Sequence, residues 1–202
     1  MMKINYYNVF NDIVKSLDGT PTVLLHSCCA PCSSYVLSVL AENFKVTVLY
    51  YNPNIEPKEE YEKRKCEQIR LLKILGVSYY DIDYLNEEYH DAVMGYENEP
   101  ENGARCTLCF NLRLKKTAKI AKENGFDFFG TTLTVSPHKN SLIINALGMK
   151  IEKDEGILFL LSDFKKEDGY KRSVELAKEY DLYRQDYCGC FYSKNERGKK
   201  DE

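Results

Sequence analysis

The sequence predicts an α/β fold in which helices cover both faces of a mainly parallel sheet. Two observations predict it. Short apolar runs alternate along the chain with longer amphipathic stretches, and glycine, proline or asparagine separates many of them. Parallel strands need such helical crossovers between them. The length of 202 residues is enough to bury a full core. We expect one α/β domain over residues 1–193 and a disordered tail over residues 194–202.

Five segments are predicted as strands because they are short, apolar and rich in β-branched or aromatic residues. In chain order they are residues 22–27, 45–51, 77–82, 126–135 and 157–161, the last as a strand or a buried loop. The turn-forming residues Asn52, Pro53 and Asn54 end the second strand.

The longer stretches between these runs are predicted as helices. In chain order they are residues 32–43, 57–75, the first part of 86–104, 105–124, 139–149 and 171–180. Pro31 favours the start of the first helix, and Gly76 and Gly125 favour the ends of two others. Residues 97–103 are predicted as a polar loop and residues 183–192 as an extended segment.

Several polar or sulfur-bearing residues follow the predicted strands directly. Cys28 and Cys29 follow the first strand, Asn52 the second, Asp83 the third and Ser136 the fourth. In parallel α/β sheets, ligands bind beyond the carboxyl ends of the strands. The sequence therefore predicts a functional edge of the sheet where these five residues meet.

Composition indicates the cellular compartment in which the protein is expected. The formal net charge is −3, and no run of 18 apolar residues predicts a membrane span. Residues 1–7 lack the apolar core of a signal peptide. We therefore expect a cytoplasmic protein that does not associate with membranes. In that reducing compartment cysteines serve metal or redox chemistry rather than structural disulfides.

The eight cysteines are clustered beyond what chance would give. About one pair within three residues is expected by accident. The sequence has four such pairs: Cys28/Cys29, Cys29/Cys32, Cys106/Cys109 and Cys188/Cys190. Cys66 stands alone in a charged helix and is interpreted as a small packing residue. The placement of the other cysteines is the most informative feature of the chain.

Four of these cysteines suit a metal centre. Cys106 and Cys109 have the C-x-x-C spacing that grips one metal or cluster, and Arg105 adds positive charge beside them. With Cys28 and Cys29 they supply the four thiolates of a [4Fe–4S] cluster or a Cys₄ zinc site. Adjacent cysteines fit a zinc knuckle poorly, so an iron–sulfur cluster is favoured. Structural zinc and a metal-free thiol–disulfide site remain alternatives.

The remaining clustered cysteines admit more than one role. Cys32 forms C-x-x-C with Cys29, as in thioredoxin-like motifs, and is kept as a second-choice ligand or resolving thiol. A disulfide between Cys188 and Cys190 would close a strained, easily reduced loop, which suits an electron relay. The same pair also suits two ligands to a second metal.

Five motifs occur together, and their combination resembles one known family. In chain order they are His26-Ser27-Cys28-Cys29-Ala30-Pro31-Cys32, Tyr51-Asn52-Pro53-Asn54-Ile55, Arg105-Cys106-x-x-Cys109, Ser136-Pro137-His138-Lys139-Asn140 and Tyr187-Cys188-Gly189-Cys190. The pattern resembles the cobalamin-independent epoxyqueuosine reductases of the QueH type over residues 22–193. The resemblance implies a nucleotide-alpha-hydrolase-like (HUP-like) fold, a [4Fe–4S] cluster and one additional iron ion.

The resemblance also implies an activity and its residues. The family converts the epoxide of epoxyqueuosine, at the wobble position of tRNA, to the alkene of queuosine. It implies that Cys28, Cys29, Cys106 and Cys109 are the cluster ligands. Further roles fall on residues of the same motifs and strand ends. By this resemblance, Cys188 and Cys190 are a redox pair or iron ligands, and Asp83 is the expected carboxylate near the iron. His138 is the expected proton donor, with His26 as an alternative. The expected substrate-binding residues are Asn52, Asn54, Arg105, Ser136 and Lys139.

A tRNA partner must be reconciled with a sequence pI of about 5.8, which lacks the basic signature of most nucleic-acid binders. Binding would then depend on a local patch. Three basic groups are candidates: Arg64/Lys65/Arg70/Lys73, Lys115/Lys116/Lys119/Lys122 and Lys165/Lys166/Lys171/Arg172. A splayed anticodon base would also need an aromatic surface, for which Tyr50, Tyr51, Tyr187 and Tyr192 are options. The reaction further requires an electron donor that the sequence does not identify.

Two other functions compete with this one. A tRNA-thiolating or ATP-using relative on a similar fold would carry a Ser-Gly-Gly-x-Asp-Ser type phosphate loop after the first strand, where this chain has residues 28–32. A non-enzymatic zinc-binding module is the other alternative. Iron rather than zinc in anaerobically purified protein separates the leading hypothesis from this second alternative.

Overall fold

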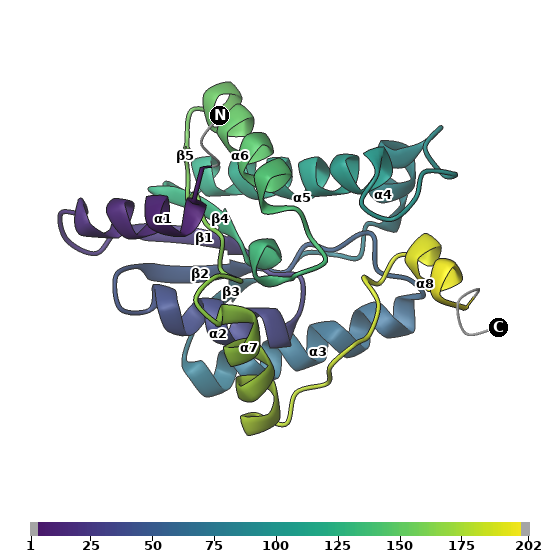
Figure 1. The fold of residues 1–202 in the computed structure, drawn as a ribbon, viewed down its shortest axis with the longest axis horizontal. Coiled ribbons are helices and arrows are strands. Elements are labelled where there is room, and N and C mark those ends of the chain that lie inside the picture. Colours follow the sequence, from purple (N-terminus) through teal and green to yellow (C-terminus); the bar gives the residue numbers. More distant parts are fainter. Residues whose placement is uncertain (1–3, 199–202) are drawn as a thin grey trace.

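A computed structural model describes residues 4–198 of the chain. Within these residues a five-stranded sheet has the order β3-β2-β1-β4-β5, and every neighbouring pair is parallel (Figure 1). The strands are β1 Thr22–His26, β2 Lys45–Leu49, β3 Ser78–Tyr80, β4 Phe128–Thr131 and β5 Leu158–Phe159. The predicted α/β fold with a parallel sheet is confirmed.

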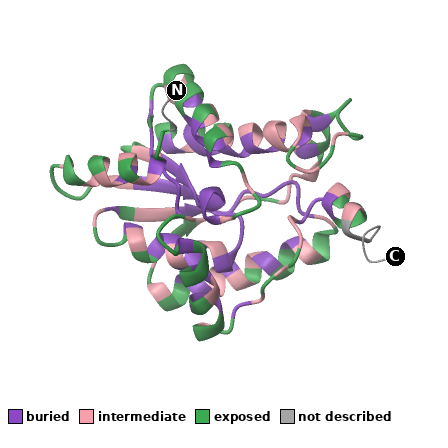
Figure 2. Ribbon diagram, in the orientation of Figure 1, coloured by how far each residue is buried: buried purple, intermediate pink, exposed green. Residues whose placement is uncertain are grey.

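Helices cover both faces of this sheet, as predicted. They are α1 Tyr6–Lys15, α2 Ala30–Leu40, α3 Lys58–Leu75, α4 Asn86–Val93, α5 Ala104–Glu123, α6 Ser141–Glu155, α7 Gly169–Glu179 and α8 Phe191–Gly198, with a 3₁₀ turn η1 at Thr132–Val135. Helix α5 packs on β1 and β4 and carries α6, whereas α2 packs against α3 and α7 on the opposite face. Figure 2 shows the central strands β1 and β4 buried between these layers and the outer faces of the helices exposed.

Alternate side chains of the central strand enter different cores. Leu24 of β1 packs with Leu114 of α5 in one buried cluster. Val23 and Leu25 pack with Val36 of α2 in the other. Successive strand side chains point to opposite faces, so a strand covered on both sides must be apolar throughout. This requirement explains the continuous apolar run that predicted β1.

The strand order creates a switch point beside β1. The chain steps outward from β1 to β2 and β3, then returns to place β4 on the other side of β1. His26, the last residue of β1, pairs in register with Thr131, the last residue of β4. The loops that leave these two strands therefore diverge and open a crevice between them. Cys28 and Cys29 lie in the first of these loops.

The structure differs from the predictions at several element ends. Strand β4 ends at Thr131, four residues before the predicted Val135, because the Thr131 side chain accepts a bond from the Leu133 N–H and starts η1. Helix α6 continues to Glu155, where Gly156 with φ +70° ends it. Helix α1 was not predicted.

The C-terminal region also differs. Residues 183–190 form no strand, and α8 occupies Phe191–Gly198, where a disordered tail was expected from residue 194. Residues 199–202 of that predicted tail lie outside the described residues. Among the helices of the described region, none combines the length and apolar character needed to cross a membrane.

Gly148 of α6 lies against β5 so closely that a methyl group has no room. A Cβ atom there would stand 2.2 Å from the ring of Phe159. We expect Gly148→Ala to lower the free energy of unfolding in urea by about 1–3 kcal/mol, because the ring must move in a packed core. Met149→Ala, at an exposed neighbour in the same helix, should change it by less than about 0.5 kcal/mol. Equal stability of the Gly148 variant and the wild type would contradict this packing.

Candidate metal centre

A cavity of about 420 Å³ lies at the switch-point edge of the sheet. Its walls come from the loops after β1, β2 and η1, from α5 and α7, and from the segment before Cys188. A second cavity of about 20 Å³ adjoins it. The residues that line both are Asn54, Glu101, Arg113, His138, Lys139 and Cys188. Of the eight cysteines, all but Cys66, which is exposed on α3, line one or both cavities.

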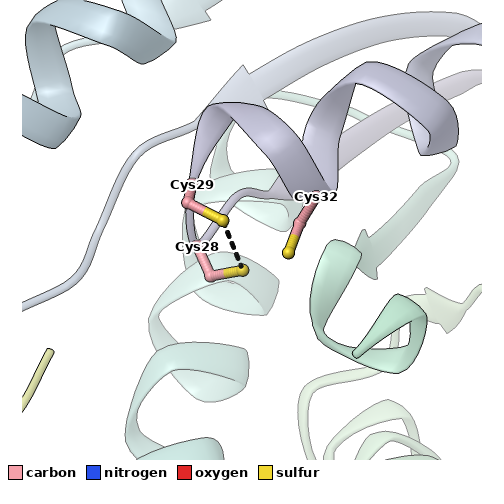
Figure 3. A group of neighbouring side chains, drawn as sticks. All are labelled: Cys28, Cys29 and Cys32. Atoms are coloured by element: carbon pink, nitrogen blue, oxygen red, sulfur yellow. Dashed lines mark hydrogen bonds between the residues drawn. The ribbon is translucent and has the colours of Figure 1, made fainter. Parts of the chain in front are cut away.

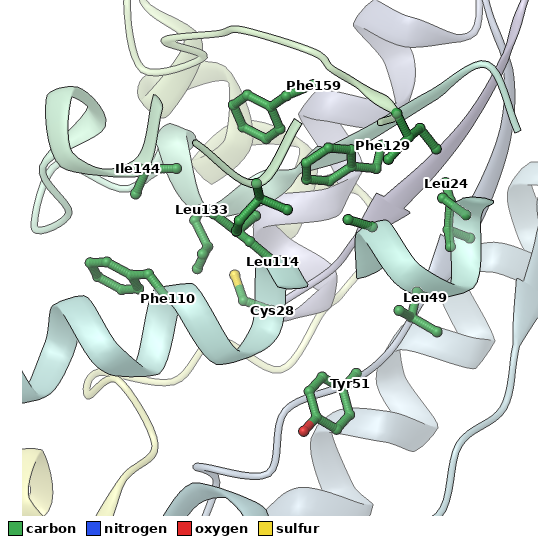
Figure 4. Packing of buried hydrophobic residues seen from close by; sticks show 14 of the residues in the cluster. Leu24, Cys28, Leu49, Tyr51, Phe110, Leu114, Phe129, Leu133, Ile144 and Phe159 are labelled. Carbon is green, nitrogen blue, oxygen red and sulfur yellow. The ribbon is translucent and has the colours of Figure 1, made fainter. Parts of the chain in front are cut away.

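Three sulfur atoms form a compact group at the wall of the larger cavity. The Sγ atoms of Cys28, Cys29 and Cys32 lie within 4.8 Å of one another, and those of Cys28 and Cys29 are 3.8 Å apart (Figure 3). Cys29 precedes α2, and Cys32 lies in its first turn. Figure 4 shows the Cys28 side chain among Leu114, Leu133 and Phe110 of the same buried cluster. This group is therefore continuous with the hydrophobic core.

Hydrogen bonds fix the loop that carries this group. The backbone N–H of Cys28 donates to Thr132 Oγ1 at 3.2 Å, which ties the loop after β1 to η1. The Asn52 amide Nδ2 donates to the Ser27 carbonyl at 2.7 Å, and the Ser27 hydroxyl donates to Gln68 Oε1 at 2.8 Å. Bonds of this kind hold the sulfur atoms in place before any metal arrives.

The three thiols differ in pKa and therefore in how readily each loses its proton. Hydrogen bonds from Cys29 and Cys32 are the main cause that lowers the pKa of the Cys28 thiol well below its usual range, and Lys139 lowers it further. The hydrogen bond that Cys29 makes to Cys28 raises the pKa of Cys29 to about 12. The hydrogen bond that Cys32 makes to Cys28 likewise raises the pKa of Cys32. Cys28 is therefore the thiol of this group that loses its proton most readily.

A second group of sulfur atoms lines the smaller cavity. It consists of Cys106 and Cys109 of α5 with Cys188 and Cys190. The Asn102 N–H donates to the Cys106 sulfur at 3.3 Å, and the Ser193 N–H donates to the Cys190 sulfur at 3.4 Å. Burial raises the pKa of Cys109 to about 12 and that of Cys190 to about 11. These thiols stay protonated at neutral pH until a cation replaces their protons.

Cys188 and Cys190 reach this position on a segment that we call the strap, residues 180–190. The strap runs beside α3 (Figure 1), and side chains one turn apart on that helix hold its backbone. Arg70 donates to the Tyr180 and Asp181 carbonyls, Glu67 accepts from the Tyr183 N–H, and Arg64 donates to the Cys188 carbonyl at 3.1 Å. The Glu56 N–H also donates to the Gly189 carbonyl at 2.9 Å.

The structure brings most of the other predicted site residues to these cavities. Asn52 and Ser136 line the larger cavity, and Asn54, His138 and Lys139 line both. Asn52 and Asn54 are buried, and their Oδ1 atoms have no hydrogen-bond partner among the described residues. Polar atoms buried without a partner are rare in proteins, so they mark places where a ligand can bind.

Two predicted site residues lie elsewhere. Asp83 is exposed and lines neither cavity, because β3 is a three-residue edge strand that lies two strands from the switch point. Arg105 is buried away from both cavities. It donates to the Glu97 and Glu99 carbonyls and pairs with Glu196 of α8 at 3.0 Å. Arg105 therefore joins the 97–103 loop to α8.

Other residues at the cavities were not predicted. Arg113 follows Cys109 by one helical turn, a spacing that places both on one face of α5 and that could have revealed it. Glu101 and Asp186 supply carboxylates, and Tyr170 and Arg184 lie at the wall formed by α7 and the strap. Asp186 directly precedes the Tyr-Cys-Gly-Cys motif, which could have indicated it. Glu101, Tyr170 and Arg184 belong to no motif of the sequence.

His26 takes no part in either cavity lining. Its ring lies in the core, with Nε2 3.2 Å from the Tyr51 carbonyl and Nδ1 3.0 Å from Thr131 Oγ1. Burial first, and then Arg113, lowers its pKa to about 3. The ring is neutral at physiological pH, with Nε2–H donating to the carbonyl, and it links the ends of β1, β2 and β4.

Comparisons with known proteins agree with the sequence motifs. The family model described as epoxyqueuosine reductase QueH matches residues 23–196. The chain belongs to the QueH family. It is 44% identical over 205 residues to epoxyqueuosine reductase QueH of Streptococcus pyogenes serotype M1, covering 97% of this chain and 80% of the relative. The QueH relative from Thermotoga maritima is 37% identical over 182 residues, covering 89% and 93%.

Solved structures place the QueH fold among nucleotide-alpha-hydrolase-like proteins, as predicted. The U34-tRNA thiolase NcsA from Methanococcus maripaludis, solved with its [4Fe-4S] cluster, matches with a TM-score of 0.57. The identity is 15%, and the match covers 93% of this chain and 67% of that one. At this identity the likeness shows the fold alone.

Gly189, between the two cysteines of the strap, has a backbone that disfavours a side chain. Its φ is +115°, and an added Cβ would lie 2.8 Å from Arg64 Nη1. We expect Gly189→Ala to displace the strap end and to raise the alkylation rate of the buried Cys190 at least tenfold in metal-free protein, measured by mass spectrometry. Gly19→Ala is the control, because Gly19 has φ +81° and open space around it. An unchanged Cys190 rate would contradict the clash.

Proposed function

We propose that this QueH protein reduces the epoxide of epoxyqueuosine in tRNA to the alkene of queuosine. The observation that carries the proposal is the convergence of seven cysteines on two adjoining cavities at the switch point of a QueH family chain. The names of its curated relatives support the same reaction. Removal of the epoxide oxygen takes two electrons and two protons and releases water.

The donor set fits an iron–sulfur centre. Thiolates are soft ligands that favour iron–sulfur clusters, copper(I) and zinc. A cubane cluster is larger than one ion, so its ligands must face it from separate walls, and α5 and the loop after β1 provide such walls. We therefore retain Cys28, Cys29, Cys106 and Cys109 as the ligands of a [4Fe–4S] cluster. Such a cluster would supply electrons one at a time.

The residues left over suit the additional iron. Cys32, Cys188 and Cys190 provide further thiols, and Cys188 lines both cavities. Asp186 lines the larger cavity together with Cys188, so it replaces Asp83 as the proposed carboxylate near the iron. A redox-active pair of Cys188 and Cys190 is the alternative role for the strap cysteines.

Lys139 and His138 provide positive charge and protons at the cavity. Burial alone would lower the pKa of Lys139, but the sulfur atoms of Cys188, Cys28 and Cys32 outweigh burial and raise it. Lys139 therefore stays charged and can stabilise negative charge on the oxygen that leaves the epoxide. His138 lines both cavities and is exposed, so it can exchange protons with water and deliver them to that oxygen.

The larger cavity also suits one splayed nucleoside. Its volume lies within the range of small-ligand sites, which is far too small for a base-paired helix. The Oδ1 atoms of Asn52 and Asn54 and the Oε1 atom of Gln185 are buried acceptors that have no partner within the described part of the chain, so they favour a ligand rich in N–H and O–H donors. Epoxyqueuosine, with ring hydroxyls and an amine, is such a ligand.

The surface beside the cavity offers a place for the rest of the tRNA. Arg184 lies over the Tyr170 ring at 5.4 Å, and Tyr187 lines the cavity nearby, which provides stacking surfaces. Lys171, directly after Tyr170, and Lys166, four residues before it, are both exposed. We therefore favour the Lys165/Lys166/Lys171/Arg172 patch for the phosphate backbone. Tyr50 and Tyr51 are buried and unsuited to stacking.

Serine variants test the cluster assignment. Replacing Cys28, Cys29, Cys106 or Cys109 should reduce bound iron and sulfide by at least half after anaerobic reconstitution, because serine is a poor ligand for iron–sulfur clusters. Cys66→Ser is the matched control and should retain full loading. Colourless wild-type protein with one zinc per chain would reject the iron–sulfur proposal in favour of a zinc module.

The strap cysteines give a different expectation. Cys188→Ser and Cys190→Ser should keep the visible spectrum of the cluster but lose at least 100-fold in turnover of epoxyqueuosine-containing tRNA with a chemical reductant. The product is measured as queuosine by mass spectrometry of tRNA digests. Loss of the cluster in these variants would instead make them cluster ligands. No queuosine from fully loaded wild-type protein would reject the proposed reaction.

A further inference from the structure

Three arginine side chains are almost fully buried in this structure, and they are neutralised in different ways. Arg64, Arg105 and Arg113 are 2%, 2% and 1% exposed. Arg64 pairs with Glu60 at 2.6 Å, and Arg105 pairs with Glu196 at 3.0 Å. Among the described residues, Arg113 forms no ion pair with a carboxylate.

Sulfur atoms surround Arg113 instead. Its Nε donates to the Cys109 carbonyl at 3.2 Å, and its Nη2 is buried with no hydrogen-bond partner among the described residues. The side chain lines both cavities, so it stands where the two groups of cysteines meet. The cysteines whose sulfur atoms favour its charge most, once they are deprotonated, are Cys109, Cys188, Cys28 and Cys106.

A second cation lies at the same place. Lys139 also lines both cavities, and its strongest favourable charges are Cys188, Cys28 and Cys32. Two cations at one cavity repel each other, and the buried Arg113 has also lost its hydration, which is unfavourable unless anions balance the charge. Among the described residues, Glu101 at these walls makes no ion pair with either cation. The cysteines that line the same two cavities, or what their sulfur atoms bind, can supply the balancing charge.

We propose that Arg113, together with Lys139, is a positioning residue that raises the reduction potential of the centre by compensating the negative charge that the centre gains on reduction. This inference rests on the proposed function, because it requires that the cysteines hold redox-active iron. Neither residue is assigned as a ligand. Arg113 acts on the reaction only through the charge of the centre, whereas Lys139 also faces the oxygen of the substrate.

The direction of the effect follows from electrostatics. A thiolate-ligated cluster is already anionic, and one more electron increases its negative charge. A nearby cation stabilises the reduced form more than the oxidised form, and the attraction is stronger inside the protein than in water. Removal of that cation lowers the reduction potential, since charge and hydrogen bonding around the sulfur atoms are among the factors that set it. An arginine stays charged at all relevant pH values, so the effect does not depend on protonation.

The test is a redox titration of anaerobically reconstituted full-length protein, in which the reduced cluster is measured by electron paramagnetic resonance. At the potential where the wild type is half reduced, Arg113→Gln should lower the ratio of reduced to oxidised cluster about tenfold, which for one electron corresponds to about 59 mV. Arg113→Lys should restore the ratio to within threefold. Lys115→Gln removes one exposed charge from the same helix and should leave the ratio within twofold.

Outcomes separate this inference from the proposed function. An Arg113→Gln ratio equal to that of the wild type, with iron bound, overturns the inference and leaves the function intact. Equal losses in Arg113→Gln and Arg113→Lys also overturn it, because they would assign a packing role. If Arg113→Gln loses its iron, Lys139→Gln decides, and an unchanged ratio overturns the inference. Wild-type protein without redox-active iron overturns both proposals.

Discussion

The parallel pairing of β1 with β2 on one side and β4 on the other is the constraint on which the centre depends. Because of this pairing, β1, β2 and β4 end at the same edge of the sheet. The segments that follow them carry Cys28 and Cys29, Asn52 and Asn54, and Thr132. The buried His26 ring bonds to Tyr51 and Thr131 and so fastens these three ends together. The crevice is therefore a property of the sheet, and the helices and the strap add their cysteines to a scaffold that already exists.

The sequence predicted those parts of the structure that depend on local pattern. Parallel β-strands buried on both faces must be apolar, so β1 and β2 were visible, and Gly76 marked the end of α3. The edge of the sheet was also predictable, because it follows from strand direction alone. Helix α1 and helix α8 were missed. Helix α1 carries an amphipathic pattern that buries Tyr6 and Phe10 and could have been read from the sequence, whereas α8 is polar and is held by contacts from distant residues such as Arg105.

Tertiary contacts explain why some site residues were predicted wrongly or missed from the sequence. Asp83 follows a strand as Asn52 does, yet β3 lies at the outer edge of the sheet and directs the chain away. Arg105 stands beside Cys106, yet its side chain turns to the 97–103 loop and α8. Arg113 lies one helical turn after Cys109, but its role becomes visible only in the structure. There it is buried without a carboxylate partner among the described residues, unlike the other buried arginines. Position along the chain predicts which residues are near, but not which way they point.

The strap has a consequence for how its sequence can change. Helix α3 and the Glu56 N–H recognise the strap through backbone groups, namely the carbonyls of Tyr180, Asp181, Cys188 and Gly189 and the N–H of Tyr183. Strap side chains add to this docking, because the Tyr183 hydroxyl donates to Glu60 and Leu182 packs with Leu71 of α3. The stripe of Arg64, Glu67 and Arg70 along α3 binds strap backbone groups that nearly any residue offers. Substitution should therefore be tolerated more readily at the exposed Asp181, which bonds to Arg70 only through its carbonyl, than at Leu182 or Tyr183.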